Sequence, residues 1–233
     1  MSGKLPPQVA VDLEAGELRD YWVRRAQQHT QDSYAGVNLS KFPEDLRVYE
    51  HLLWLAAPEV VVELGVQFGA SSLWFRDRLA TLTAYGRVQA PEVIGVELDT
   101  SLALPALEQA DPGWSKTITL LEGDVRDPAL AAQVTHLVRG RSVLIIEDSA
   151  HVYDTTRAAL ELYAPLVRPG GYMVVEDGCV DVEALRLEGW PRGVLPALRD
   201  WLATPAGSEF EVRRDLELYG VTCHPEGFLQ RRS

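Results

Sequence analysis

Two apolar segments near the middle of the chain each end in a pair of acids. Residues 144–148 read Leu-Ile-Ile-Glu-Asp, residues 173–177 read Met-Val-Val-Glu-Asp, and the segment between them has room for one helix. If both segments are parallel strands, their carboxyl ends lie at one edge of a sheet and the acids converge there. Carboxylate oxygens are the ligands that magnesium, calcium and manganese ions prefer. The spacing therefore predicts a hard divalent cation at that edge.

One acid of the first pair is expected to face this site. Side chains alternate along a strand, so Glu147 and Asp148 should point to opposite faces. We expect Asp148 to reach the site because it stands at the strand end, which leaves Glu147 a structural or cofactor-side role. His151 follows in the next turn, where an imidazole is a candidate catalytic base for a departing proton. A hydrogen-bonded structural histidine is the alternative.

A glycine-containing turn after residues 60–64 has the features of a nucleotide-type site. Glycine lets the backbone approach a ligand closely, and hydroxyls lie near the start of the following helix. The pattern is G-x-x-x-G after an acid, which departs from the G-x-G-x-x-G of a dinucleotide site. An acid here repels a pyrophosphate and attracts a cationic amino-acid group, which favours S-adenosylmethionine over NAD. The candidate cofactor-binding residues are Glu63, Gly65, Gly69, Ser71 and Ser72.

Two further acids follow the next two expected strands. Glu97 lies at the end of residues 93–98, where folds of this type present an acid to the hydroxyls of a ribose. A solvated carboxylate at a strand end is the alternative. Asp124 follows residues 118–122 and is a candidate for the adenine side, with an ordinary Gly-Asp turn as the alternative.

The elements that position these residues are strands alternating with helices. This order predicts an α/β fold with a doubly wound, mostly parallel sheet covered on both faces. An apolar period of 3.6 predicts a helix between the two acidic strand ends, capped by Asp154 or Thr155 and stopped at residues 169–171. The expected strands are residues 60–64, 93–98, 118–122, 143–147 and 172–176, followed by a helix over 195–202 and an antiparallel pair over 210–219 and 221–231.

The N-terminal part is expected to form a helical cap. Residues 13–26 and 45–57 are amphipathic, and residues 33–43 join them with polar and aromatic side chains. This connector is either a lid over the carboxyl edge of the sheet or an ordinary surface loop. We expect residues 1–57 to form the cap and residues 58–233 to form the main domain, as one structural unit.

Composition narrows the class of protein. The chain has 233 residues, 46% of them hydrophobic, which is enough for the core of one domain. A formal net charge of -12 disfavours nucleic acid as a partner, since a phosphate backbone would be repelled. Two cysteines do not make a disulfide framework. Without a signal peptide or an apolar run of about 18 residues, we expect a cytoplasmic protein with no membrane contact.

Together these motifs resemble one group of class I S-adenosylmethionine-dependent methyltransferases, the cephalosporin hydroxylases or rhamnosyl O-methyltransferases. The resemblance runs from about Lys41 to Arg232. Its pieces are Lys41-x-Pro43-x-Asp45, Glu63-Leu64-Gly65-x-x-x-Gly69, Trp74-Phe75-Arg76-Asp77, Asp148-Ser149-Ala150-His151, Tyr163-Ala164-Pro165-Leu166-Val167, Val174-Val175-Glu176-Asp177 and residues 225–232.

The resemblance implies magnesium-dependent methyl transfer to a hydroxyl of a small, often glycosylated or antibiotic-like molecule. It implies that Asp148, Glu176 and Asp177 hold the metal. Many relatives of the macrocin and mycinamicin type carry aspartate at both positions of the second pair, so Glu176 is either a ligand or a support for one. The resemblance also supports a catalytic role for His151. It implies that residues 58–233 form the methyltransferase domain.

Several alternatives stay open from the sequence. A non-catalytic S-adenosylmethionine-binding subunit of a biosynthetic complex is one, and an NAD-type oxidoreductase is another. The acceptor can be a sugar, a catechol-like ring or a β-lactam hydroxyl, and N-methylation is open. Cys179, Trp190, Pro191 and Trp201 either line the acceptor pocket or pack in the core. The N-terminal helices can also pack between protomers of a homo-oligomer.

Overall fold

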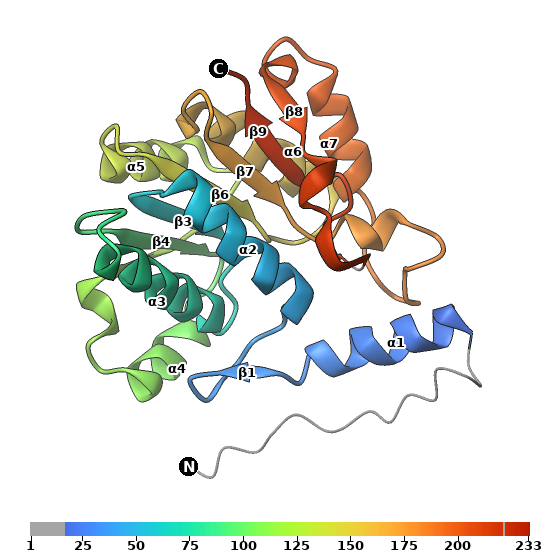
Figure 1. The fold of residues 1–233 in the computed structure, drawn as a ribbon, viewed down its shortest axis with the longest axis horizontal. Helices are drawn as coiled ribbons and strands as arrows, with labels where there is room; N and C mark the ends of the chain where they lie inside the picture. Colours follow the sequence, from blue (N-terminus) through green and yellow to red (C-terminus); the bar gives the residue numbers. More distant parts are fainter. Residues whose placement is uncertain (1–16, 221) are drawn as a thin grey trace.

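The centre of the molecule is a seven-stranded sheet in the order β5-β4-β3-β6-β7-β9-β8 (Figure 1). The computed structural model describes residues 17–220 and 222–233. Strands β3 to β7 run parallel, and β9 pairs antiparallel with both β7 and β8. The predicted doubly wound fold with an antiparallel C-terminal pair is confirmed. The strands are β3 (Val60–Leu64), β4 (Glu92–Glu97), β5 (Ile118–Glu122), β6 (Val143–Glu147), β7 (Tyr172–Val175), β8 (Phe210–Val212) and β9 (Phe228–Arg231).

Helices cover both faces of this sheet. Val62 and Ile145 pack toward the side that includes Leu160 of one helix, and Val61 and Leu144 pack toward the other side. Every residue of β3, β6 and β7 is buried, which explains why these strands are apolar runs rather than alternating ones. The helices are α1 (Leu18–His29), α2 (Pro43–Ala56), α3 (Ala70–Ala84), α4 (Ala103–Ala110), α5 (Pro128–Val138), α6 (Tyr153–Tyr163) and α7 (Val194–Leu202).

The register of the parallel strands brings the predicted acids to one edge. Leu64 of β3 pairs with Glu147 of β6, and Glu147 pairs with Val175 of β7. The loops that follow these strands therefore begin at the same level. Strand order also reverses beside β3, because β4 and β5 lie on one side of it and β6 on the other. Such a reversal opens a crevice at the carboxyl ends of the strands, where α/β folds bind ligands.

The N-terminal segment lies along the same edge (Figure 1). Helix α1 is followed by a short hairpin, β1 (Ser33–Tyr34) and β2 (Val37–Asn38), and then by α2. Trp22 of α1 packs on Phe42 with the ring centroids 5.2 Å apart. Of the helix expected over residues 13–26, positions 13–16 lie outside the described residues. Helix α2 begins at Pro43, two residues before the expected start, because proline fits the first turn of a helix.

Two details of the prediction were wrong. The C-terminal strands are shorter than 210–219 and 221–231, because the chain leaves β8 after Val212 and makes short 3-10 turns at Arg214–Leu216 and Leu218–Gly220; Val221 lies outside the described residues. Helix α6 is not capped by Asp154 or Thr155 but begins at Tyr153 with Val152 at the cap position. Among the described residues, none of the helices is long and apolar enough to cross a membrane.

Candidate active site

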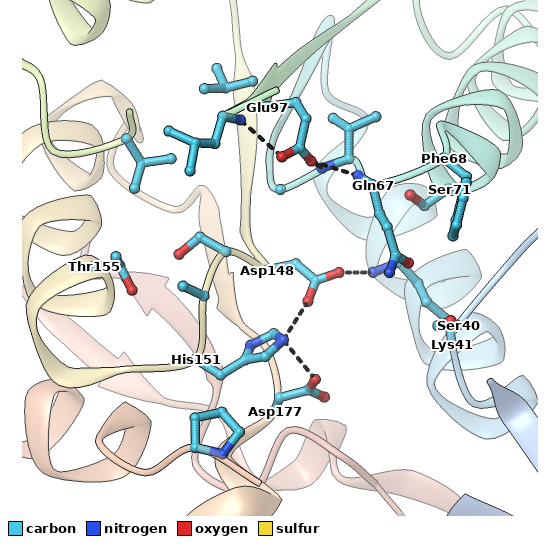
Figure 2. A pocket seen from close by; sticks show the side chains of 18 of the residues that line it. Ser40, Lys41, Gln67, Phe68, Ser71, Glu97, Asp148, His151, Thr155 and Asp177 are labelled. Atoms are coloured by element: carbon cyan, nitrogen blue, oxygen red, sulfur yellow. Dashed lines mark hydrogen bonds and ion pairs between the residues drawn. The ribbon is translucent and has the colours of Figure 1, made fainter. Parts of the chain in front are cut away.

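A cavity of about 1060 Å³ opens at the carboxyl edge of the sheet. Its wall combines the loops after β3, β4, β5, β6 and β7 with the segment between α1 and α2. Figure 2 shows how the side chains from these separate loops surround one space. The predicted site residues in this wall are Gly65, Ser71, Glu97, Asp124, Asp148, His151 and Asp177. The other four, Glu63, Gly69, Ser72 and Glu176, lie outside it.

Asp148, His151 and Asp177 form a close group of metal-type ligands in this wall. The Nε2 atom of His151 lies 3.9 Å from Oδ1 of Asp148 and 3.4 Å from Oδ2 of Asp177 (Figure 2). One ligand atom from each residue fits within 4.8 Å of the others. Both His151 and Asp177 have left-handed backbone angles, with φ of 56° and 58°. Such strain in non-glycine residues concentrates at functional sites.

A buried lysine joins the two predicted acid pairs. The ammonium of Lys41 donates to Oδ2 of Asp148 at 2.8 Å and to both carboxylate oxygens of Glu176 at 2.8 and 2.7 Å. The hydroxyl of Tyr49 donates to Oε1 of Glu176 at 2.5 Å. Glu176 is therefore held by Lys41 and Tyr49. It also offers a ligand atom within 4.8 Å of ligand atoms of Asp177 and His224.

Electrostatics in this group favour an additional cation. Burial raises the pKa of Asp148 well above its ordinary value, and the negative charge of Glu176 adds to the rise against the opposing charge of Lys41. Burial also acts to raise the pKa of Glu176, but the charge of Lys41 and the hydrogen bonds from Lys41 and Tyr49 outweigh it and lower that pKa to about 2. The ammonium of Lys41 is thus shared between the neighbouring carboxylates of Asp148 and Glu176. Two carboxylates and an imidazole are also a donor set that suits a divalent ion.

The two glycines of the turn after β3 are required by contacts within the protein. Gly65 has a φ of 98°, and a Cβ there would lie 1.9 Å from the carbonyl oxygen of Asp148. Gly69 has a φ of 86°, and a Cβ there would lie 2.7 Å from the side chain of Leu107. These contacts explain both glycines, and the close approach of a ligand stays a prediction. Gly65 borders the cavity, at the point where the loop after β3 touches the loop after β6.

Glu63 and Ser72 lie beneath this turn rather than in the cavity wall. Both are fully buried, and the hydroxyl of Ser72 donates to Oε2 of Glu63 at 2.5 Å. The other oxygen of Glu63 has no hydrogen-bond partner. Burial raises the pKa of Glu63 to about 7, against the charge of Lys41 and the hydroxyls of Ser71 and Ser72. Glu63 therefore lies below the floor of the site, without direct access to the cavity.

Glu97 anchors the turn after β3. Its Oε2 accepts hydrogen bonds from the backbone N–H groups of Val66 at 2.8 Å and Gln67 at 2.6 Å, and its Oε1 accepts from Leu98 at 2.8 Å (Figure 2). A carboxylate has about four lone-pair positions, so these three bonds fix its direction and leave capacity for another donor. The carboxylate of Glu97 is therefore positioned to accept a further hydrogen bond from a hydroxyl of a ligand.

Asp124 is engaged by a neighbour in its own loop. Arg126 donates to both of its carboxylate oxygens, the shortest contact being 2.6 Å. These hydrogen bonds lower the pKa of Asp124 to about 2. Asp124 and Arg126 both line the cavity, so Asp124 would act on the adenine side together with Arg126.

Several important residues were missed by sequence reasoning. His224, to which no chemistry was assigned, is buried, and its Nδ1 accepts the backbone N–H of Asp177 at 3.1 Å. Its Nε2 lies 3.7 Å from Asp45, whose Oδ2 also accepts the N–H of Cys223 at 2.9 Å. Lys41 and Asp45 were noticed only as part of a family motif. No local pattern indicates such contacts, because their partners lie more than a hundred positions away.

The residues considered for the acceptor pocket are divided between the cavity and the core. Trp190 and Pro191 line the cavity, as expected for an acceptor pocket. Trp201 does not, because it packs against Phe210 with the ring centroids 5.2 Å apart. Cys179 is both buried and part of the cavity wall, which combines the two roles considered for it.

Comparison with known proteins identifies a single family. A family model described as Rhamnosyl O-methyltransferase/CmcI matches residues 26–232. The rhamnosyl O-methyltransferase of Mycobacterium tuberculosis is 27% identical over 205 residues, which is 87% of this chain and 79% of that protein. An apo structure of CmcI superposes with a TM-score of 0.61 at 24% identity, covering 99% of this chain and 92% of the other. A CmcI structure described with Mg and SAM gives 0.59 at 23% identity, covering 99% and 93%.

Proposed function

Since the chain belongs to the Rhamnosyl O-methyltransferase/CmcI family and is an S-adenosylmethionine-dependent O-methyltransferase, we propose that it methylates a hydroxyl of a small secondary metabolite. The proposed acceptor is a sugar or an antibiotic-like compound, and the proposed second cofactor is Mg²⁺. The observation that carries the proposal is the convergence of Asp148, His151 and Asp177 on the cavity beside the turn after β3.

The cofactor is assigned to the part of the cavity that lies over β3, β4 and β5. There Glu97, already oriented by three backbone N–H groups, accepts the ribose hydroxyls. Ser71 and the loop of Asp124 border the same part of the cavity. A volume of about 1060 Å³ is at the upper end of ordinary ligand pockets, and it accommodates a cofactor with an acceptor beside it.

The magnesium ion is assigned to Asp148 and Asp177. Their carboxylates face each other across His151, and their oxygens match the hard-ligand preference of this ion. We assign Glu176 the role of holding Lys41, because its oxygens are bound to Lys41 and Tyr49. It becomes a ligand only if those two residues release it.

The chain's own residues then complete the reaction. Mg²⁺, when bound, orients a hydroxyl and makes it a better nucleophile by lowering its pKa. His151 accepts the departing proton at Nε2, and Asp177, 3.4 Å away, orients the ring. The cavity positions acceptor and cofactor together, which converts a bimolecular step into an oriented one.

The segment between α1 and α2 supplies a wall of the same cavity. Asn38, Ser40 and Lys41 of this segment line the cavity, together with His29 at the end of α1. We assign residues 17–57 the role of a cap on the methyltransferase domain, which excludes water from the reacting groups. Trp190 and Pro191, on the opposite loop, are assigned to acceptor recognition.

The proposal is tested by measuring cofactor binding and turnover separately. Isothermal titration should show binding of S-adenosylmethionine and not of NAD. Release of S-adenosylhomocysteine is then followed with glycosylated, catechol-type and β-lactam acceptors, with Mg²⁺ or with excess chelator. We expect turnover to require Mg²⁺ and to be abolished by Asp148→Ala, with cofactor affinity changed only slightly. Full activity in excess chelator contradicts the metal assignment, and cofactor binding without any acceptor-dependent release favours a non-catalytic subunit.

A further inference from the structure

The chain's only two cysteines come together in the wall of the cavity. Cys179 lies in the 3-10 turn Gly178–Asp181 that follows β7, and Cys223 lies in the loop before β9. Both are buried free thiols. The backbone N–H of Cys179 donates to the carbonyl of Cys223 at 3.1 Å, which fixes the two residues beside each other.

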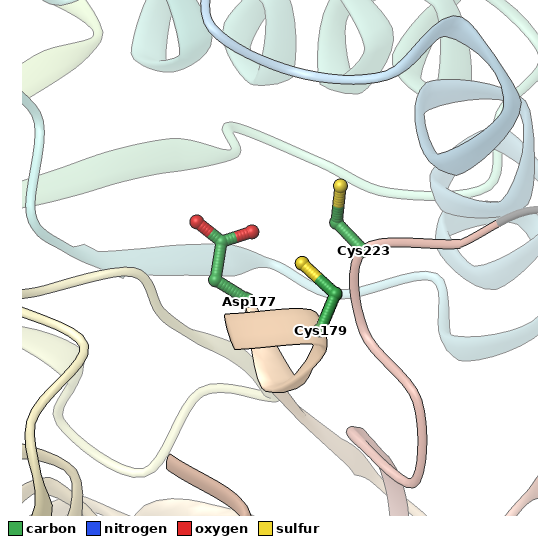
Figure 3. Close-up of side chains that lie close together, drawn as sticks. All are labelled: Asp177, Cys179 and Cys223. Carbon is green, nitrogen blue, oxygen red and sulfur yellow. The ribbon is translucent and has the colours of Figure 1, made fainter. Parts of the chain in front are cut away.

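Asp177 completes a compact group with the two thiols. One ligand atom from each of Asp177, Cys179 and Cys223 lies within 4.8 Å of the others. Figure 3 shows both sulfur atoms and the carboxylate extending toward the same region. The ligand atoms of a tetrahedral zinc site lie roughly 3.3–3.8 Å apart, given bond lengths of about 2.0–2.3 Å. Small side-chain rotations are therefore enough to place one ion between these three residues.

We propose that Asp177, Cys179 and Cys223 form a binding site for a thiophilic divalent cation such as Zn²⁺. Two thiolates and one carboxylate are a soft donor set that suits zinc and cadmium and that magnesium avoids. The fourth ligand position faces the cavity and is open to water or to a group of a bound molecule. This site is chemically distinct from the oxygen and nitrogen group of Asp148 and His151.

The protein holds these residues in place without an ion. The backbone N–H of Cys223 donates to the buried Asp45 at 2.9 Å. A Cβ at Gly178 would lie 2.9 Å from both Leu195 and the carbonyl of Pro225, so the turn is packed closely against its surroundings. Because the thiols are brought together by the fold, an ion does not have to order two flexible segments to bind them.

The shared carboxylate couples this site to the proposed magnesium site. Oδ2 of Asp177 lies 3.4 Å from His151, and Asp177 belongs both to the group with Asp148 and His151 and to the group with the two thiols. A zinc ion at the thiols therefore draws Asp177 away from Mg²⁺. This consequence, unlike the binding itself, rests on the proposed function, and it predicts that Zn²⁺ lowers the affinity of the chain for Mg²⁺.

The binding is tested with Co²⁺, which replaces Zn²⁺ and absorbs in the near ultraviolet when thiolates bind it. The full chain, with both thiols reduced and counted, is titrated with Co²⁺ in excess Mg²⁺ and without S-adenosylmethionine. Because the chain has two cysteines, a thiolate-to-cobalt band reports on these residues alone. We expect the band to saturate at one equivalent and to disappear when Zn²⁺ is added.

Matched variants separate the two sites. Cys179→Ser and Cys223→Ser should each weaken Co²⁺ binding by roughly 10-fold or more and remove most of the band. Asp148→Asn, which leaves both thiols intact, should retain the band. Circular dichroism checks the fold of each variant.

The absence of a thiolate band in the wild-type chain overturns the proposal, even if the serine variants fail to fold. So does a band that survives in a folded Cys179→Ser or Cys223→Ser variant with unchanged affinity. Loss of the band in Asp148→Asn would mean a single shared centre and would also overturn it. Failure of the methyltransferase proposal looks different, since it affects cofactor binding and turnover and leaves the cobalt band in place.

Discussion

The ammonium of Lys41 lies 2.8 Å from Oδ2 of Asp148, across 107 positions of sequence. This contact leaves Oδ1 of Asp148 facing His151 and the cavity. Lys41 also binds Glu176, so one buried cation holds together the acids that follow two different strands. The orientation of the proposed metal ligand Asp148 therefore depends on a residue of the N-terminal segment.

Replacing Lys41 with methionine should strongly destabilise the chain. Asp148 and Glu176 would be left as buried charges without their counter-charge, a loss of about 3–5 kcal/mol in the free energy of unfolding. Added Mg²⁺ should recover more stability in Lys41→Met than in the wild type, because the ion replaces the missing charge. Denaturant unfolding with and without Mg²⁺ measures both effects.

Arg47→Met is the matched control for this variant. Arg47 pairs with Glu50 in the next turn of the same helix but is exposed to solvent, so its removal should leave unfolding unchanged. Equal stability of Lys41→Met and the wild type would mean that the buried ion pair is absent in solution.

Glu63 should make stability fall as the pH rises. Its pKa is about 7 in the folded chain against an ordinary value of 4.5, so the folded state keeps its proton where the unfolded state has lost it. Its contribution is fully present below pH 4.5 and is lost as the pH rises to about 7, a change of about 3 kcal/mol at 1.36 kcal/mol per unit. Unfolding measured between these pH values should lose this slope in Glu63→Gln.

Glu188→Gln, at an exposed position, provides the comparison and should keep the wild-type pH dependence. If Glu63→Gln also keeps the whole slope, another group is responsible and Glu63 is not held in its protonated form.

His151→Gln should slow the reaction without affecting the fold. Loss of a general base costs roughly 10²- to 10⁴-fold in turnover, while the affinity for S-adenosylmethionine and the melting temperature stay the same. Added imidazole should restore part of the rate. His136→Gln, on the exposed side of α5, should behave as the wild type. A lower melting temperature with unchanged turnover would assign His151 a structural role only.

Gly65→Ala should be much more damaging than alanine at another glycine with positive φ. The new Cβ would lie 1.9 Å from the carbonyl oxygen of Asp148, so two loops must separate, at a cost of about 3 kcal/mol or more. Gly86 has a φ of 69° and open space around it, so Gly86→Ala costs only about 1 kcal/mol of backbone strain. Thermal unfolding compares the two, and similar losses would refute the close contact between the loops.

Much of the fold could be predicted because the strands are buried on both faces. The apolar run of β3 was predicted with its observed ends, β4 is shifted by one residue at both ends, and β7 is one residue shorter than predicted. The C-terminal pair was predicted too long because the described residues between Val212 and Phe228 contain strand-forming types but are not paired in the sheet. Propensity alone does not reveal which of them find a neighbouring strand.

The site could be predicted where it depends on topology and not where it depends on packing. Asp148 and Asp177 were placed at one edge from the order of strands alone, and both lie in the cavity wall. The contacts of Lys41 and Tyr49 with Glu176 were not foreseen, because they join the N-terminal segment to the loop after β7. The contact that requires glycine at position 65 was not foreseen for the same reason, since the atom that Gly65 avoids belongs to another loop.

The most direct measurement is a crystal structure of the chain with S-adenosylhomocysteine and Mn²⁺, in which anomalous scattering locates the ion. The account predicts one strong peak between Asp148 and Asp177, within about 2.3 Å of an oxygen of each, beside the sulfur of the cofactor. A site without such a peak, or with the two carboxylates turned away from one another, would contradict it.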